Sequence, residues 1–120
     1  MTTKFKRYGE TITWTNGTGS DVAVNDLVAV GGVLAVALVD IPDGETGELG
    51  TEGVFEVAKV TGTAINQGDP IDYDASEGAV STGITEATGD LSDCAVCWAD
   101  AASGDTTASI KLGRVAAVVN

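Results

Sequence analysis

The chain repeats one pattern of residues at positions about sixty apart. Residues 34–49 read LAVALVDIPDGETGEL, and residues 94–110 read CAVCWADAASGDTTASI. In each segment a run of small apolar residues ends at an Asp, and after three intervening residues a Gly and an acid follow. The matched positions are Asp40 and Asp100, Gly44 and Gly104, and Glu45 and Asp105. A repeat of this kind usually reflects repeated structural units rather than a catalytic site, and it predicts a domain built from two related β-units.

A second match lies upstream of the first. Asn25-Asp26-Leu27-Val28 corresponds to Gly68-Asp69-Pro70-Ile71, and an insertion between Tyr73 and Cys94 lengthens the second copy. Residues 74–92 of this insertion are mainly Ser, Thr, Gly and acids, which is typical of a short hairpin or a long exposed loop. We interpret Asp40 and Asp100 as turn formers rather than as acidic sites, with the two following glycines supplying the backbone geometry of the turns.

The composition favours strands over helices. The chain has 120 residues with 16 Gly, 43% apolar residues and only 5% aromatic residues. Val and Thr are frequent and helical periodicity is almost absent, which predicts an all-β domain with at most a short helix. The expected architecture is a small β-barrel or a sandwich-like domain. We expect residues 1–8 to form a flexible basic arm and residues 9–120 to form a single β-rich domain.

Local patterns place several strands and turns. Residues 10–15 alternate and end at Asn16-Gly17, which is a tight-turn signal. Gly31-Gly32 predicts a hairpin into residues 33–39, where an unbroken apolar run indicates burial on both faces. Pro70 marks either the start of a strand or an edge strand, since it cannot donate a hydrogen bond to a sheet.

The charge is strongly acidic and unevenly distributed. The chain has 6 basic and 18 acidic residues, and three of the basic ones lie within the first seven positions. From residue 8 onward 3 basic residues face 18 acidic ones, which is a net charge of −15. Such a body repels phosphate backbones, so we expect no nucleic-acid partner. A solvated acidic surface, solubility in a crowded assembly, a cationic partner surface and adaptation to high salt all remain compatible with this charge.

The sequence contains no pattern typical of export or membrane insertion. The N-terminal segment has no apolar stretch behind its charges, and the longest nearly unbroken apolar run, residues 28–39, has only twelve positions. A membrane helix needs about 20. We therefore expect a soluble protein that is made in a cytoplasm and has no membrane partner.

Catalytic and metal-binding patterns are weak. The absence of His excludes Ser-His and Cys-His nucleophilic systems, and no phosphate-binding loop is present. Cys94 and Cys97 form a single CxxC inside an apolar strand, where residues three apart face opposite sides, so we expect two small packed residues rather than a zinc site or a disulfide. Asp69, Asp72 and Asp74 with Glu77 could gather oxygen ligands, but their spacing does not match a calcium loop. We expect no enzyme, no cofactor and no metal.

The arrangement of motifs resembles the DUF2190 family of phage proteins, which are regarded as capsid cement or decoration proteins. The resemblance covers roughly residues 8–112. It rests on the order of GETITW, VNDLVAVGGVLAVALVDIPDGETGEL, TEGVFEVAKVTG, AINQGDPIDYD and WADAASGDTTASIKL. Departures from the family pattern are Asn25, where a Gly is usual before Asp26, and the CxxC.

The resemblance implies a structural virion protein. Family members are expected to form β-rich homotrimers that bind the outside of an icosahedral phage head, contact the major capsid protein and stabilise the shell. In this chain the basic arm is the candidate for that contact, through Thr2, Thr3, Lys4, Phe5, Lys6 and Arg7. The alternative is a β-rich binding module displayed on a virion, in which residues 74–92 recognise a glycan or a host surface.

Overall fold

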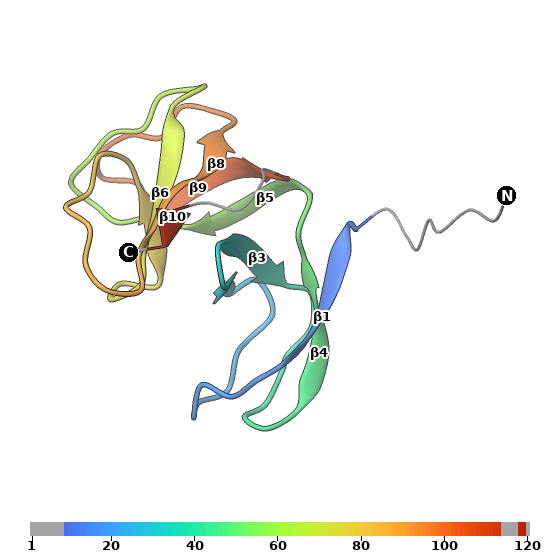
Figure 1. Cartoon of the computed structure of the whole chain (residues 1–120). Helices are drawn as coiled ribbons and strands as arrows, with labels where there is room; N and C mark the ends of the chain where they lie inside the picture. Colours follow the sequence, from blue (N-terminus) through green and yellow to red (C-terminus); the bar gives the residue numbers. More distant parts are fainter. Residues whose placement is uncertain (1–8, 114–117, 120) are drawn as a thin grey trace, which may run out of the picture.

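The computed structural model describes residues 9–113 and 118–119, and within these it contains strands and turns but no helix. Two antiparallel sheets lie against each other in a sandwich-like arrangement, and neither closes into a barrel (Figure 1). The prediction of an all-β fold is therefore confirmed, with the sandwich-like alternative as the one observed. No helix able to span a membrane occurs in the described part of the chain.

The first sheet has four strands in the order β1-β4-β3-β2. Its strands are β1 (Thr11–Thr15), β2 (Leu27–Val30), β3 (Val33–Ala37) and β4 (Thr46–Gly50). Val30 pairs with Val33 across the two-residue Gly31-Gly32 hairpin, and Gly31 has a φ of 57°. This positive φ is what a tight hairpin turn requires, so the predicted hairpin is confirmed.

The second sheet has six strands, five of them in the order β5-β9-β8-β6-β7, and β10 pairs with β8. Its strands are β5 (Gly53–Ala58), β6 (Pro70–Asp74), β7 (Ala79–Ser81), β8 (Leu91–Cys97), β9 (Thr107–Leu112) and β10 (Val118–Val119). Pro70 begins β6, which lies between β7 and β8, so it marks a strand start and not an edge.

The two sheets are built from the same unit, and the pairing register shows it. In the first sheet β1 pairs with β4 through Thr15 and Thr46, and in the second β5 pairs with β9 through Ala58 and Thr107. Leu27 pairs with Val36 in the first sheet, and Pro70 pairs with Val96 at the equivalent position of the second sheet. In the same way, Ala37 pairs with Leu49 in the first sheet and Cys97 pairs with Ile110 in the second. We name residues 10–50 unit one and residues 53–112 unit two. The predicted pair of β-units is confirmed.

The matched aspartates hold equivalent loops in the two units. Asp40 Oδ1 accepts a hydrogen bond from the Val24 amide at 2.9 Å, and Asp100 Oδ1 accepts one from the Gln67 amide at 2.7 Å. Val22 and Ile41 form an antiparallel bridge in unit one, and Ile65 and Ala101 form the same bridge in unit two. Each Asp therefore fastens the loop that precedes its neighbouring strand, because its carboxylate satisfies a backbone donor there.

The turns after these aspartates differ in one respect from the prediction. Glu45 donates to Pro42 O at 2.9 Å and Asp105 donates to Ala102 O at 3.0 Å, so both turns are closed. Gly44 has the expected positive φ of 84°, but Gly104 has no positive φ. The glycine geometry predicted for the second turn is therefore wrong. Its first amide is instead satisfied by the side chain of Asp105, which accepts a hydrogen bond from Ala102 N at 2.9 Å.

Two apolar clusters hold the molecule together. The larger is the core of unit two, and it includes Leu34 and Val36 from β3 of unit one. The smaller is the core of unit one and contains Ala35 and Ala37 of the same strand. Residues 34–37 are all buried, which confirms the prediction of burial on both faces of this strand, while Leu38 and Val39 beyond its end are exposed.

Residues 74–92 combine a hairpin with a loop. β7 pairs with β6 through Asp74 and Ala79, and its three residues are all buried. Val80 also bridges to Lys59 next to β5. The following residues are largely exposed up to Asp90, which is buried again. The inserted segment thus contributes core residues as well as an exposed loop.

Candidate functional site

The site predicted from the sequence is the basic arm, and it lies outside the described residues. Thr2, Thr3, Lys4, Phe5, Lys6 and Arg7 all precede Gly9, where the description begins. Gly9 is fastened to the body, because its carbonyl accepts a hydrogen bond from Thr51 Oγ1. The arm is thus attached at a defined point, at the start of β1. Its role stays a prediction.

Lys59 is a positively charged residue that is buried in the protein interior. Its side chain is only 4% exposed, and Nζ donates to the carbonyl of Val60 at 2.9 Å and to those of Ser103 and Asp105 at 3.4 Å. Asn16 occupies the corresponding position of unit one, where Nδ2 donates to Ser20 O and Ile41 O at 2.8 Å. Both side chains tie a turn to the end of the first strand of their unit. Lys59 is therefore unsuited to contact a partner.

An exposed apolar patch covers the solvent side of the larger sheet. Val54 on β5 and Trp98 after β8 are each 48% exposed, and Val96 is half-buried. Lys111 on β9 pairs with both Val54 and Val96, and its Nζ lies 5.2 Å from the centroid of the Trp98 ring. A cation over an indole face at this distance is attracted by the ring. We name these four residues the Trp98 patch.

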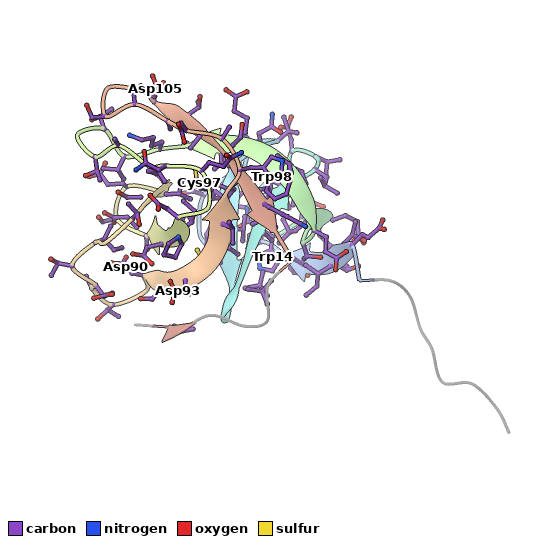
Figure 2. The ribbon with its side chains drawn as sticks, turned by 90° about the horizontal axis from the view of Figure 1, so that it is seen from above. Trp14, Asp90, Asp93, Cys97, Trp98 and Asp105 are labelled. Carbon is purple, nitrogen blue, oxygen red and sulfur yellow. The ribbon has the colours of Figure 1, made fainter. Side chains whose placement is uncertain are left out.

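The Trp98 patch continues into a shallow hollow of about 440 Å³ between the ends of β5 and β9. Its lining is Glu52, Gly53, Val96, Lys111, Leu112 and Gly113. Figure 2 shows Trp98 well away from Asp90 and Asp93, which lie together at the other side of the view. The hollow is open and carries one acid and one base, which suits surface contact rather than the enclosure of a small molecule.

The acidic residues that resembled a metal site serve as hydrogen-bond acceptors in separate turns. Asp69 Oδ2 accepts from the Asn66 amide at 2.9 Å, and Asp74 Oδ1 accepts from the Ser76 amide at 3.1 Å. Asp72 is buried, and its two oxygens accept from the amides of Asp93 and Ile84. No group of three or more metal-ligating side chains gathers within residues 9–113 and 118–119.

Asp90 anchors the insertion and was not singled out in the sequence. Its side chain is 3% exposed, and it accepts hydrogen bonds from the amides of Ala75 and Ala87 at 2.8 Å. One carboxylate thereby joins the hairpin turn after β6 to the loop before β8. The only signal in the sequence is its position between Gly89 and the apolar start of β8, where an Asp commonly closes a turn.

Cys94 and Cys97 are both buried thiols, as the spacing predicts. Cys94 Sγ contacts Ile71 O at 3.2 Å, and Cys97 Sγ contacts Ala99 O at 3.1 Å. Burial raises the pKa of the Cys97 thiol; the hydrogen bond to the backbone of Ala99 opposes this rise, and the charges of Asp69 and Asp100 add smaller increases. A buried thiol with a raised pKa is a poor nucleophile, so Cys97 is placed to pack rather than to react.

Most of the chain matches one known protein family. A model of phage cement proteins matches residues 6–112, from the end of the basic segment to the last residue of β9. The chain belongs to the phage cement protein family. The matched region contains both β-units, the insertion and the Trp98 patch. A search of curated proteins finds no match.

Membership places this cement protein among structural components of the phage capsid. Its family is one of structural, non-enzymatic proteins that bind a capsid. The resemblance inferred from the sequence is therefore confirmed. The described residues agree with a structural role, since the buried charged side chains of Lys59 and Asp90 hold turns together.

Proposed function

We propose that this cement protein is a homotrimer that binds the outer surface of an icosahedral phage head and stabilises it by contacting neighbouring major capsid proteins. The observation that carries the proposal, beyond family membership, is the distribution of charge. From residue 8 onward the chain has a net charge of −15, while the first seven residues carry three cations and no acid.

The acidic body favours the outside of the shell over the inside. Packaged DNA lines the inner wall of a filled head, and its phosphates repel a surface of like charge. In the described residues Lys111 is exposed and Lys59 is buried, so little positive charge is available on the body to offset this repulsion. A protein with this body is best accommodated where it faces solvent.

Trimer formation is supported by the apolar surface. Mean hydropathy is +0.16 despite a net charge of −12. Val54, Trp98 and Val119 are all close to half exposed. Burial of such surface between subunits is a common outcome for a small domain with a thin core.

The basic arm is the proposed capsid contact, and its removal is the test. Purified heads lacking the cement protein are incubated with the full chain, with a chain lacking residues 1–7, and with a Lys4→Gln, Lys6→Gln, Arg7→Gln chain. We expect both variants to fold and to occupy the shell at least tenfold less at equal concentration. Binding of the full chain should weaken as salt increases, because exposed charge pairs are screened.

Unchanged occupancy by both variants would remove the arm from the interface while leaving the cement function intact. Failure of the full chain to bind heads would overturn the function itself. Val24→Glu, in an exposed loop of unit one, serves as the control for a non-specific change of charge.

The binding-module alternative stays a prediction about residues 74–92. Deleting the whole segment would remove β7, whose residues are buried, so substitutions in the exposed loop are the better probe. Thr85→Ala, Glu86→Ala and Thr88→Ala together should leave the fold intact. Glycan-array binding that the wild-type chain shows and this variant loses would favour the alternative.

A further inference from the structure

The two β-units pack against each other through unlike faces. Along β3, Ala35 and Ala37 point into the core of unit one, whereas Leu34 and Val36 point into the core of unit two. We call the face that builds a unit's own core its front face, and the opposite face its back face. The back face of unit one is thus covered by the front face of unit two.

One contact shows how closely these faces fit. Gly50 lies on the back face of β4, and a Cβ at this position would lie 2.9 Å from Cζ of Phe55 and 3.1 Å from Cδ2 of Leu38. Phe55 belongs to β5 of unit two and packs against that unit's core. The aromatic ring of Phe55 in unit two therefore packs directly against the backbone of Gly50 in unit one, beside Leu38.

The equivalent faces at the two ends of the molecule have no such cover among residues 9–113 and 118–119. On the back face of unit two, Trp98 corresponds to Leu38, Lys111 to Gly50 and Val96 to Val36, because their strands pair in the same register. This is the Trp98 patch. On the front face of unit one, Ile12 corresponds to Phe55, and Ile12, Trp14, Val22 and Val30 are only partly buried against their core.

We propose that the occupant of each free face is a second copy of this chain, so that the back face of unit two in one subunit packs on the front face of unit one in the next. The contact would repeat between subunits the pairing of back face and front face that joins the two units within one, but with the Lys111 side chain in the place of Gly50. A heterologous contact of this kind generates a closed ring when its rotation closes. The inference deepens the trimer of the proposed function, which would then hold six copies of the β-unit.

The charges favour self-association at this place. The body of the chain is strongly acidic, so identical subunits repel one another over most of their surface. The Trp98 patch instead carries two large exposed apolar side chains, those of Val54 and Trp98, together with Lys111. Among residues 9–113 and 118–119, Lys111 is the only Lys or Arg that is exposed. Glu56, on the same side of β5, accepts a hydrogen bond from Thr107 Oγ1 at 2.8 Å.

Two charge-introducing variants and their mixture test the arrangement. Trp98→Glu places a charge on the free back face, and Ile12→Glu places one on the free front face, where Ile12 is partly buried against the core of unit one. Val24→Glu, whose parent residue is 45% exposed, is the matched control. Native mass measurement should give three times the 12.1 kDa chain mass for the wild type and the control. It should give monomers for each of the two variants alone.

The mixture distinguishes a head-to-tail contact from a symmetric one. Each variant keeps the face that the other has lost, so an equimolar mixture should form 1:1 dimers that cannot close. If Ile12→Glu does not fold by circular dichroism, Ile12→Ser takes its place. Trimers that persist in both variants, or a mixture that stays monomeric, would overturn this inference and leave the trimer proposal standing. A monomeric wild type would overturn both.

Discussion

At the scale of single residues, the repeated aspartates show how a sequence motif can mark architecture. Asp40 and Asp100 each accept a hydrogen bond from the backbone of a loop that lies far away in the sequence. Asn25 and Gly68 occupy equivalent positions in these loops, and both have positive φ, 76° and 89°. Asn tolerates this conformation better than most other non-glycine residues, which explains why Asn25 can stand in unit one where unit two has Gly68.

Loss of the Asp100 carboxylate should destabilise unit two. Asp100→Ala leaves the Gln67 amide without its 2.7 Å acceptor, and we expect the free energy of unfolding to fall by about 1 kcal/mol in urea titration. Asp100→Asn retains an acceptor oxygen and should lose less. An Asp100→Ala chain within about 0.5 kcal/mol of wild type would show that the loop does not depend on this bond.

Lys59 should matter for stability and Lys111 should not. Lys59→Met keeps the aliphatic stem but removes three hydrogen bonds to backbone carbonyls, so we expect a loss of about 1–3 kcal/mol. Lys111→Met, at an exposed position, is the matched control and should stay within about 0.5 kcal/mol of wild type. Equal melting of the two variants would contradict the structural role of Lys59.

The roles of individual residues were only partly predictable. Asp40 and Asp100 could be recognised because each ends an apolar run and precedes a turn signal. Lys59 and Asp90 could not, since nothing in the local sequence indicates that a charged side chain will be buried by segments more than ten residues away. Gly104 was misjudged because a Gly does not need a positive φ where a neighbouring Asp side chain can close the turn.

At the scale of elements, β4 has glycines where other structure comes close. A Cβ on Gly47 would lie 2.6 Å from Cγ1 and 2.8 Å from Cδ1 of Ile41, which is buried and has little room to move. The strand thus gives up side-chain contacts so that the loop after β3 can pack across it. Alternation and hairpin signals predicted the strands well, whereas this close approach depends on the folded arrangement and has no local signal.

Gly47→Ala should therefore destabilise the protein by about 1–3 kcal/mol, because a methyl group is forced into a filled space. Gly104→Ala is the control, since no atom lies within 4 Å of its Cβ position and its φ is not positive. Thermal melting followed by circular dichroism measures both. If Gly47→Ala melts together with Gly104→Ala, the packing of Ile41 on β4 is not as tight as described.

At the scale of the whole molecule, duplication accounts for most of what the sequence could predict. The repeated pattern predicted two related units, and their registers agree strand by strand. It could not predict how the units pack, because a sandwich and a barrel are compatible with the same alternation of residues. The Trp98 patch was missed for a similar reason: its members come from β5, β8 and β9 and meet only after folding.

The central claim is that this cement protein lies on the outside of the capsid, and cryo-electron microscopy of the parent particle tests it most directly. We predict density for both β-units on the outer surface, with the acidic loops facing solvent and the first residues of the chain directed to the major capsid protein. The density should follow a local threefold axis. Density for this chain on the inner wall of the shell, or its absence from the mature head, would contradict the account.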